Sequence, residues 1–97
     1  MALVDDVKKY LRISNTAFDV EINDLIAAAQ ADMVLCGIDE DKAEAANPDA
    51  HIKRAITLYV KASFGWDNPD SGRLYESYAS LRNHLSQSVD YMAGEAV

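Results

Sequence analysis

The chain has few of the residues that small proteins use as covalent or metal staples. Its 97 residues include one cysteine and two histidines. The single cysteine, Cys36, excludes an internal disulfide, and His51 and His84 form no cluster at zinc-site spacing. The sequence therefore predicts no metal site and no cofactor, and packed secondary structure has to stabilise the fold.

Positive charge is also scarce. Nine Lys and Arg residues stand against sixteen Asp and Glu, which gives a formal net charge of -7. Residues 1–50 hold eleven acidic and four basic residues, whereas residues 51–97 hold five of each. Because nucleic-acid binders neutralise phosphates with Lys and Arg, this balance disfavours sequence-specific DNA binding.

Long hydrophobic runs are absent. The longest weakly polar stretch, residues 25–37, is interrupted by Gln30 and Asp32 and falls short of the roughly 20 apolar residues that span a bilayer. Residues 1–13 are too charged for a signal peptide. We expect one domain over residues 1–97, made in the cytoplasm and without a membrane segment.

What the sequence does have is helical periodicity, with no strand-like alternation. The pattern predicts an all-α fold, a small bundle of four principal helices at residues 3–12, 19–36, 48–64 and 73–92. Asn47 and Pro48 read as the N-cap and first residue of the third helix. The acidic connector at residues 38–49 has at most one helical turn, near residues 41–45. The expected core comprises Val7, Leu11, Ile22, Leu25, Ile26, Ile56, Tyr59, Leu81 and Leu85.

No constellation for catalysis is evident. The histidines lie on separate predicted helices without a nucleophile elbow, and the four glycines stand singly, so there is no phosphate loop. The run Asp39-Glu40-Asp41 lacks the ligand spacing of a calcium loop and reads as a solvated acidic loop. Cys36 reads as a small buried residue at a helix end. We expect that the protein is not an enzyme.

Basic residues do gather on one face of the third helix, where Lys53, Arg54 and Lys61 lie together with Thr57. A helix-turn-helix DNA binder is disfavoured, because that motif uses a turn of only about three or four residues and the acids of the connector would approach the phosphates. A solvated basic stripe, or one that meets an acidic neighbour, is the better interpretation.

The helix at residues 19–36 has two apolar faces. Opposite its core stripe, a second strip carries small and branched apolar side chains, namely Val20, Ala27, Ala31, Val34 and Leu35. Alanine alone is explained by helix propensity, whereas Val34 and Leu35 favour either a helix buried at the centre of the bundle or a partner. We take this strip as the candidate assembly interface.

Several stretches of the sequence resemble one protein family. They are the run Tyr59-Val60-Lys61-Ala62-Ser63-Phe64-Gly65-Trp66-Asp67-Asn68-Pro69, the helix from Arg73 to Leu85, the opening Val4-x-x-Val7-x-x-Tyr10-Leu11-Arg12-Ile13, and the helix from Ile22 to Cys36. Together they resemble the head-to-tail connector, or adaptor, proteins of long-tailed bacteriophages, which are often labelled DNA-packaging proteins.

The resemblance implies a structural virion protein with no catalytic residues. It implies a homo-oligomeric ring at the head–tail junction, with the portal protein and a tail or stopper protein as partners, that completes the DNA exit channel after packaging. DNA would pass through without sequence-specific binding. Independently of the resemblance, we interpret Phe64, Trp66 and Pro69 as a hydrophobic plug that closes the end of the bundle, in preference to a direct docking site. A small acidic inhibitor or DNA mimic, of the anti-restriction or immunity type, is the alternative function.

Overall fold

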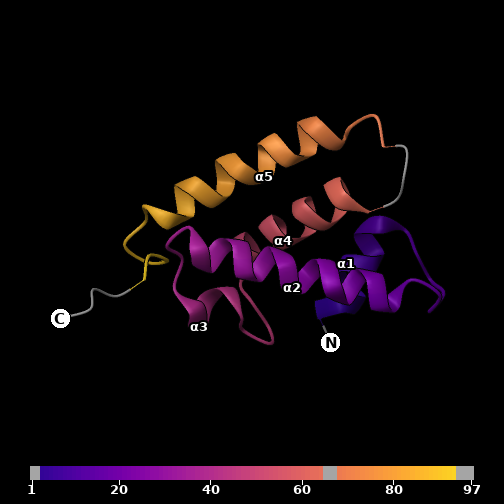
Figure 1. Cartoon of the computed structure of the whole chain (residues 1–97). Coiled ribbons are helices and arrows are strands. Elements are labelled where there is room, and N and C mark those ends of the chain that lie inside the picture. The colour runs from indigo at the N-terminus through magenta and orange to yellow at the C-terminus, as the bar shows by residue number, and fades with distance from the viewer. Residues whose placement is uncertain (1–2, 65–67, 94–97) are drawn as a thin grey trace.

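The computed structural model describes residues 3–64 and 68–93 and is helical in those ranges. Its elements are α1 (Leu3–Leu11), α2 (Asp19–Leu35), α3 (Glu40–Ala43), α4 (Ala50–Ser63) and α5 (Ser71–Ser86) (Figure 1). In the described ranges the only β-type pairing is a single antiparallel bridge between Ile38 and Met92. The all-α prediction is confirmed, and the four principal helices lie where the periodicity placed them, apart from their ends.

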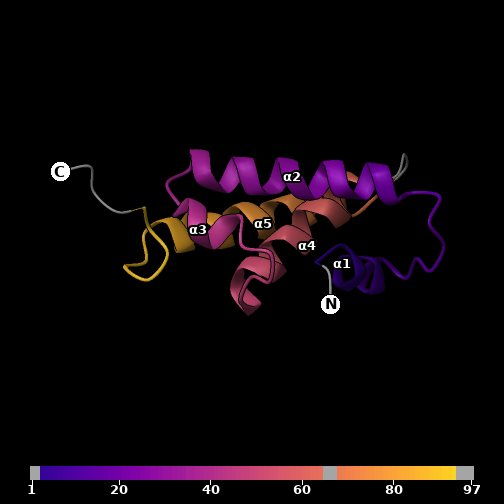
Figure 2. The ribbon, with the colours of Figure 1, turned by 90° about the horizontal axis from the view of Figure 1, so that it is seen from below.

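Helix α4 is the centre of the packing, because it contacts α1, α2 and α5. From below, α2 runs along one edge of the molecule, while α1 and the first turns of α4 lie toward the opposite edge (Figure 2). Five of the predicted core residues are buried and the other four are partly buried against them. The buried ones are Val7, Ile22, Ile26, Ile56 and Leu85, and the partly buried ones are Leu11, Leu25, Tyr59 and Leu81.

The start of α4 differs from the prediction. Asp49, not Asn47, is the N-cap, and its Oδ1 accepts a hydrogen bond of 3.0 Å from the backbone N–H of Ile52. Pro48 precedes the helix and is buried. The sequence offers an Asx residue on each side of this proline, and a carboxylate at the cap also interacts favourably with the positive end of the helix dipole.

The end of α5 differs more. The helix stops at Ser86 rather than Met92, and the Ser88 carbonyl accepts from the backbone N–H groups of Tyr91 and Met92 in a turn. The chain then pairs with the segment after α2. The Asp39 N–H donates to the Tyr91 carbonyl at 2.7 Å, and the Ala93 N–H donates to the Gly37 carbonyl at 2.8 Å. These tertiary hydrogen bonds replace the helical ones that the periodicity predicted.

The acidic connector is anchored rather than a fully solvated loop. It contains the short helix α3, whose N-cap Asp39 accepts from the Asp41 N–H at 3.2 Å. Ile38 and Ala43 are buried in the core. The acids Glu40, Asp41 and Glu44 are nevertheless exposed, so the expectation of a solvated acidic surface holds for the side chains alone.

Two smaller expectations are also corrected. Cys36, at the C-cap of α2, is half-buried rather than buried. Of the expected plug, Phe64 is partly buried and meets Phe18 edge-on at 5.5 Å, but Pro69 is exposed. Trp66 lies outside the described residues.

Candidate assembly surfaces

The outer face of α2 is the first candidate surface. Val20 is 77% exposed and Leu35 is 85% exposed, and Ala27 and Ala31 between them are exposed as well. Val34 is different, because it is partly buried and packs against the core. At about 100° per residue it stands at the border between the two faces of the helix. Four of the five predicted interface residues therefore face outward, and one lies at the edge.

The outer face is apolar along its length and acidic at one end. Val20 and Leu35 are fifteen residues apart, a length of about 22 Å along a helix axis. Asp24 lies on the same line, with Glu21 beside it, and both are exposed. Helix α2 contains no Lys or Arg. It therefore presents a strip of small and apolar side chains with negative charge only.

A polar cluster braces α2 against α5 beneath this face. The Asp32 carboxylate accepts hydrogen bonds from the Tyr78 hydroxyl and from Arg82 Nη1, the latter at 2.8 Å. The Arg82 guanidinium also lies 5.4 Å from the centre of the Tyr78 ring. These contacts join the side of α2 to α5.

The titration of the cluster follows from its contacts. Partial burial raises the pKa of Asp32, but the hydrogen bonds from Tyr78 and Arg82 outweigh burial and bring its pKa below the usual value. Burial and the hydrogen bond to Asp32 raise the pKa of Tyr78. Asp32 is thus ionised and Tyr78 protonated at neutral pH, as the donor and acceptor roles require.

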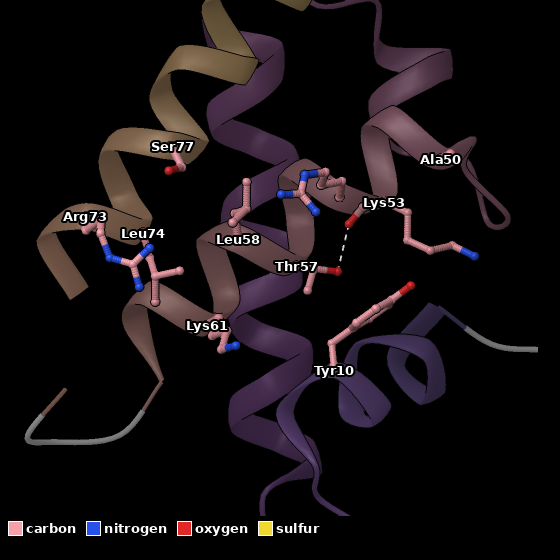
Figure 3. Close-up of a pocket in the computed structure, with 10 residues that line it drawn as sticks. Tyr10, Ala50, Lys53, Thr57, Leu58, Lys61, Arg73, Leu74 and Ser77 are labelled. Atoms are coloured by element: carbon pink, nitrogen blue, oxygen red, sulfur yellow. Dashed lines mark hydrogen bonds between the residues drawn. The ribbon is translucent and has the colours of Figure 1, made fainter. Parts of the chain in front are cut away.

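The second candidate surface is a groove between α1, α4 and α5. It has a volume of about 670 Å³. Cationic side chains from two helices line it, together with an apolar floor and an aromatic side chain from α1 (Figure 3). The lining comprises Tyr10, Ala50, Lys53, Arg54, Thr57, Leu58, Lys61, Arg73, Leu74 and Ser77. Four of the nine basic residues of the chain thus meet at one place, with no acid among the lining residues that fall within 3–64 and 68–93.

Sequence reasoning found only half of this groove. It grouped Lys53, Arg54, Thr57 and Lys61, which do share the groove face of α4. It did not assign Tyr10 to this groove, where the side chain is 60% exposed. Arg73 comes from the start of α5, and no spacing along the chain could show that α5 brings it beside α4.

The histidines and the cysteine are not brought together. His51 is exposed on α4, where its ring meets Tyr91 edge-on at 6.1 Å, and His84 is exposed in the last turn of α5. In the described part of the chain, no group of three or more His, Cys, Asp or Glu residues could hold a metal ion. Nor is any helix there long and apolar enough to cross a membrane.

The fold defines a class of protein: a small all-α protein, with no strands in the described ranges. Comparison with protein families then gives the particular family, because the model for phage connector proteins matches residues 3–92. The chain belongs to the phage connector protein family. Comparisons with curated proteins and with solved structures gave no significant match. A connector is a structural part of the phage particle, so the chain is a virion protein that associates with other virion components.

Proposed function

We propose that copies of this chain form an adaptor ring between the portal protein and the tail, completing the channel through which DNA leaves the head. The observation that carries the proposal is the family match over residues 3–92. The outer face of α2, with Val20, Ala27, Ala31 and Leu35 exposed, supports it, because an apolar strip on a small helical protein is a typical contact surface. In this role residues 1–97 act as one connector domain.

The charge of the chain suits the passage of DNA. A net charge of -7 per copy gives the assembled ring a field that repels phosphates, so DNA slides through without being held. Specific DNA recognition would require the opposite, a basic surface turned toward the duplex.

The experiment is to delete the gene from the phage genome that encodes the chain and to examine the particles by negative-stain electron microscopy. We expect DNA-filled heads without tails. Supplying a tagged chain in trans restores tailed particles, and gold-labelled antibody against the tag marks the head–tail junction.

Tailed particles at normal yield after the deletion contradict the proposal. So does a tagged chain that is absent from purified particles. The inhibitor alternative predicts that absence, together with loss of resistance to a host nuclease when the gene is deleted.

A further inference from the structure

Ion pairs between the helices neutralise some of the charged side chains of the bundle. Lys8 pairs with Asp19 at 2.7 Å, Arg82 with Asp32 at 2.8 Å, and Lys53 with Asp6 at 2.9 Å. These three ion pairs join α1 to α2, α2 to α5 and α1 to α4. In each pair, one acidic and one basic side chain neutralise each other.

The ion pairs leave two acids on α2. Of the four acidic residues in this helix, Asp19 and Asp32 are held by Lys8 and Arg82. Within residues 3–64 and 68–93, Glu21 and Asp24 have no ion-pair partner, and both are exposed beside Val20 and Ala27. The outer face of α2 therefore combines two free carboxylates with an apolar strip.

The groove has the opposite charge. Lys53 is neutralised by Asp6. Among the described residues, the ion-pair partner of Arg73 is Asp70, at 3.5 Å in a solvent-exposed contact, a kind of pair worth little. In the described ranges, Arg54 and Lys61 take part in no ion pair. Both residues are exposed, and both line the groove together with Leu58 and Leu74.

The two surfaces lie on opposite sides of α4. Helix α2 packs against α4 and runs behind it when the groove is viewed from the front (Figure 3). The view from below likewise places α2 at one edge and α1, which borders the groove, toward the other (Figure 2). One copy can therefore offer its α2 face to one neighbour and its groove to another, which is the geometry of a head-to-tail contact.

We propose that the groove between α1, α4 and α5 receives the outer face of α2 from a second copy of this chain. Glu21 and Asp24 of one copy then meet Arg54 and Lys61 of the next, and the small side chains Ala27 and Ala31 let α2 approach the groove closely. This inference deepens the proposed function and rests on it, since it names the two halves of the contact that builds the ring.

Charge decides among the possible occupants. Two α2 faces together would bring carboxylates near carboxylates, and two grooves would bring cations near cations, so neither like pair is favoured. DNA would also be attracted to the groove. However, a groove left open in the channel would hold DNA rather than let it pass. The neighbour's α2 neutralises the groove.

The test reverses the charges and then restores their complementarity. The variant Arg54→Glu with Lys61→Glu keeps two exposed positions exposed and places acids against Glu21 and Asp24 of the neighbour. We expect the amount of chain in purified particles to fall at least roughly tenfold. Adding Glu21→Lys and Asp24→Lys to the same chain re-creates opposite charges at every contact and should restore incorporation.

A matched control uses the other exposed acids. Adding Glu40→Lys and Asp41→Lys, on α3, to the double variant changes the net charge equally but leaves the α2 face acidic. We expect no rescue. A melting curve for every variant, including the charge swap that combines Arg54→Glu with Asp24→Lys, separates a lost contact from a lost fold.

The outcomes distinguish the two proposals. Wild-type chain absent from particles overturns the proposed function and the inference with it. Wild-type chain present, together with unimpaired incorporation of the Arg54→Glu, Lys61→Glu variant, overturns the inference alone. Rescue by the α3 changes instead of the α2 changes makes α3 the occupant. If the wild type binds DNA, if Arg54→Glu with Lys61→Glu abolishes this binding, and if the α2 changes give no rescue, then DNA is the occupant of the groove.

Discussion

Arg82 of α5 reaches across the bundle to Asp32 of α2, with Nη1 2.8 Å from Oδ2. The contact joins residues fifty positions apart. Only 15% of the Arg82 side chain and 30% of the Asp32 side chain are exposed. A partly buried charge pair of this kind is costly to break on one side only.

The first prediction concerns this pair. Arg82→Leu leaves the Asp32 carboxylate with Tyr78 as its only side-chain donor among the described residues. We expect a loss of about 1–3 kcal/mol in the free energy of unfolding, measured by urea denaturation. Arg73→Leu is the control, because the Arg73 contact is exposed and its loss should cost under about 1 kcal/mol. Equal losses for the two variants would show that the brace is unimportant.

The second prediction is the pH dependence of stability. The pKa of Asp32 is below its usual value in the folded protein, mainly because hydrogen bonds from Tyr78 and Arg82 overcome the effect of burial. The pKa of Asp6 is lowered by the hydrogen bond from Lys53, and that of Asp49 is lowered by hydrogen bonds that outweigh partial burial. Their stabilising contribution is fully present above the unfolded pKa of about 3.9 and is lost as pH falls through the folded pKa values.

We therefore expect the free energy of unfolding to decrease as pH is lowered from 5 toward 2. Asp32→Asn removes one of these titrations, so the decrease in that variant should be smaller, although its stability at pH 7 is lower. Urea denaturation at a series of pH values measures both. A variant with the same pH slope as the wild type would contradict the assignment to Asp32.

The third prediction separates the two faces of the bundle. Ile56 is fully buried on α4 and Leu35 is 85% exposed on α2. Ile56→Ala should cost about 2–5 kcal/mol, because it removes buried methyl groups and leaves a cavity. Leu35→Ala should change stability by less than about 0.5 kcal/mol. Thermal melting of both variants checks this, and a large loss at Leu35 would mean that its side chain is covered in the free protein.

The fourth prediction tests the start of α4. Asp49→Ala removes the acceptor for the Ile52 N–H and for the Tyr91 hydroxyl, which donates to Asp49 Oδ2 at 2.8 Å. We expect a loss of about 0.5–2 kcal/mol, the usual cost of removing an N-cap. Asn47→Ala should be nearly neutral, because Asn47 is exposed and does not cap the helix. A larger stability loss for Asn47→Ala than for Asp49→Ala would show that Asn47 caps the helix, as the sequence predicted.

Local sequence patterns could predict the helices and most of the core. The spacing of Ile22, Leu25 and Ile26 identified the core face of α2, where Ile22 and Ile26 are buried and Leu25 is partly buried. This works because hydrophobic burial and the helical period act within one segment. The choice between Asn47 and Asp49 failed for a local reason as well, because both are good caps.

Features that depend on distant segments could not be predicted in this way. The end of α5 is decided by the pairing of Tyr91 and Ala93 with Asp39 and Gly37, and nothing in residues 87–92 specifies that partner. The groove likewise requires α1 and α5 to be placed beside α4. The outer face of α2, by contrast, was visible in the sequence, because a second apolar strip is a property of one helix.

The final prediction is that Ala31→Glu blocks assembly without unfolding the chain. Ala31 is exposed near the middle of the outer face of α2, so a glutamate there is solvated in the free protein. In the assembled contact, where small side chains let α2 approach the groove closely, the longer side chain would overpack the interface. Ser80→Glu, at an exposed position in α5, is the matched control. We expect normal melting temperatures for both variants, tailless particles with Ala31→Glu, and normal phage yield with Ser80→Glu. Normal yield with Ala31→Glu would reject the α2 interface, whereas a collapsed fold would place Ala31 in the core.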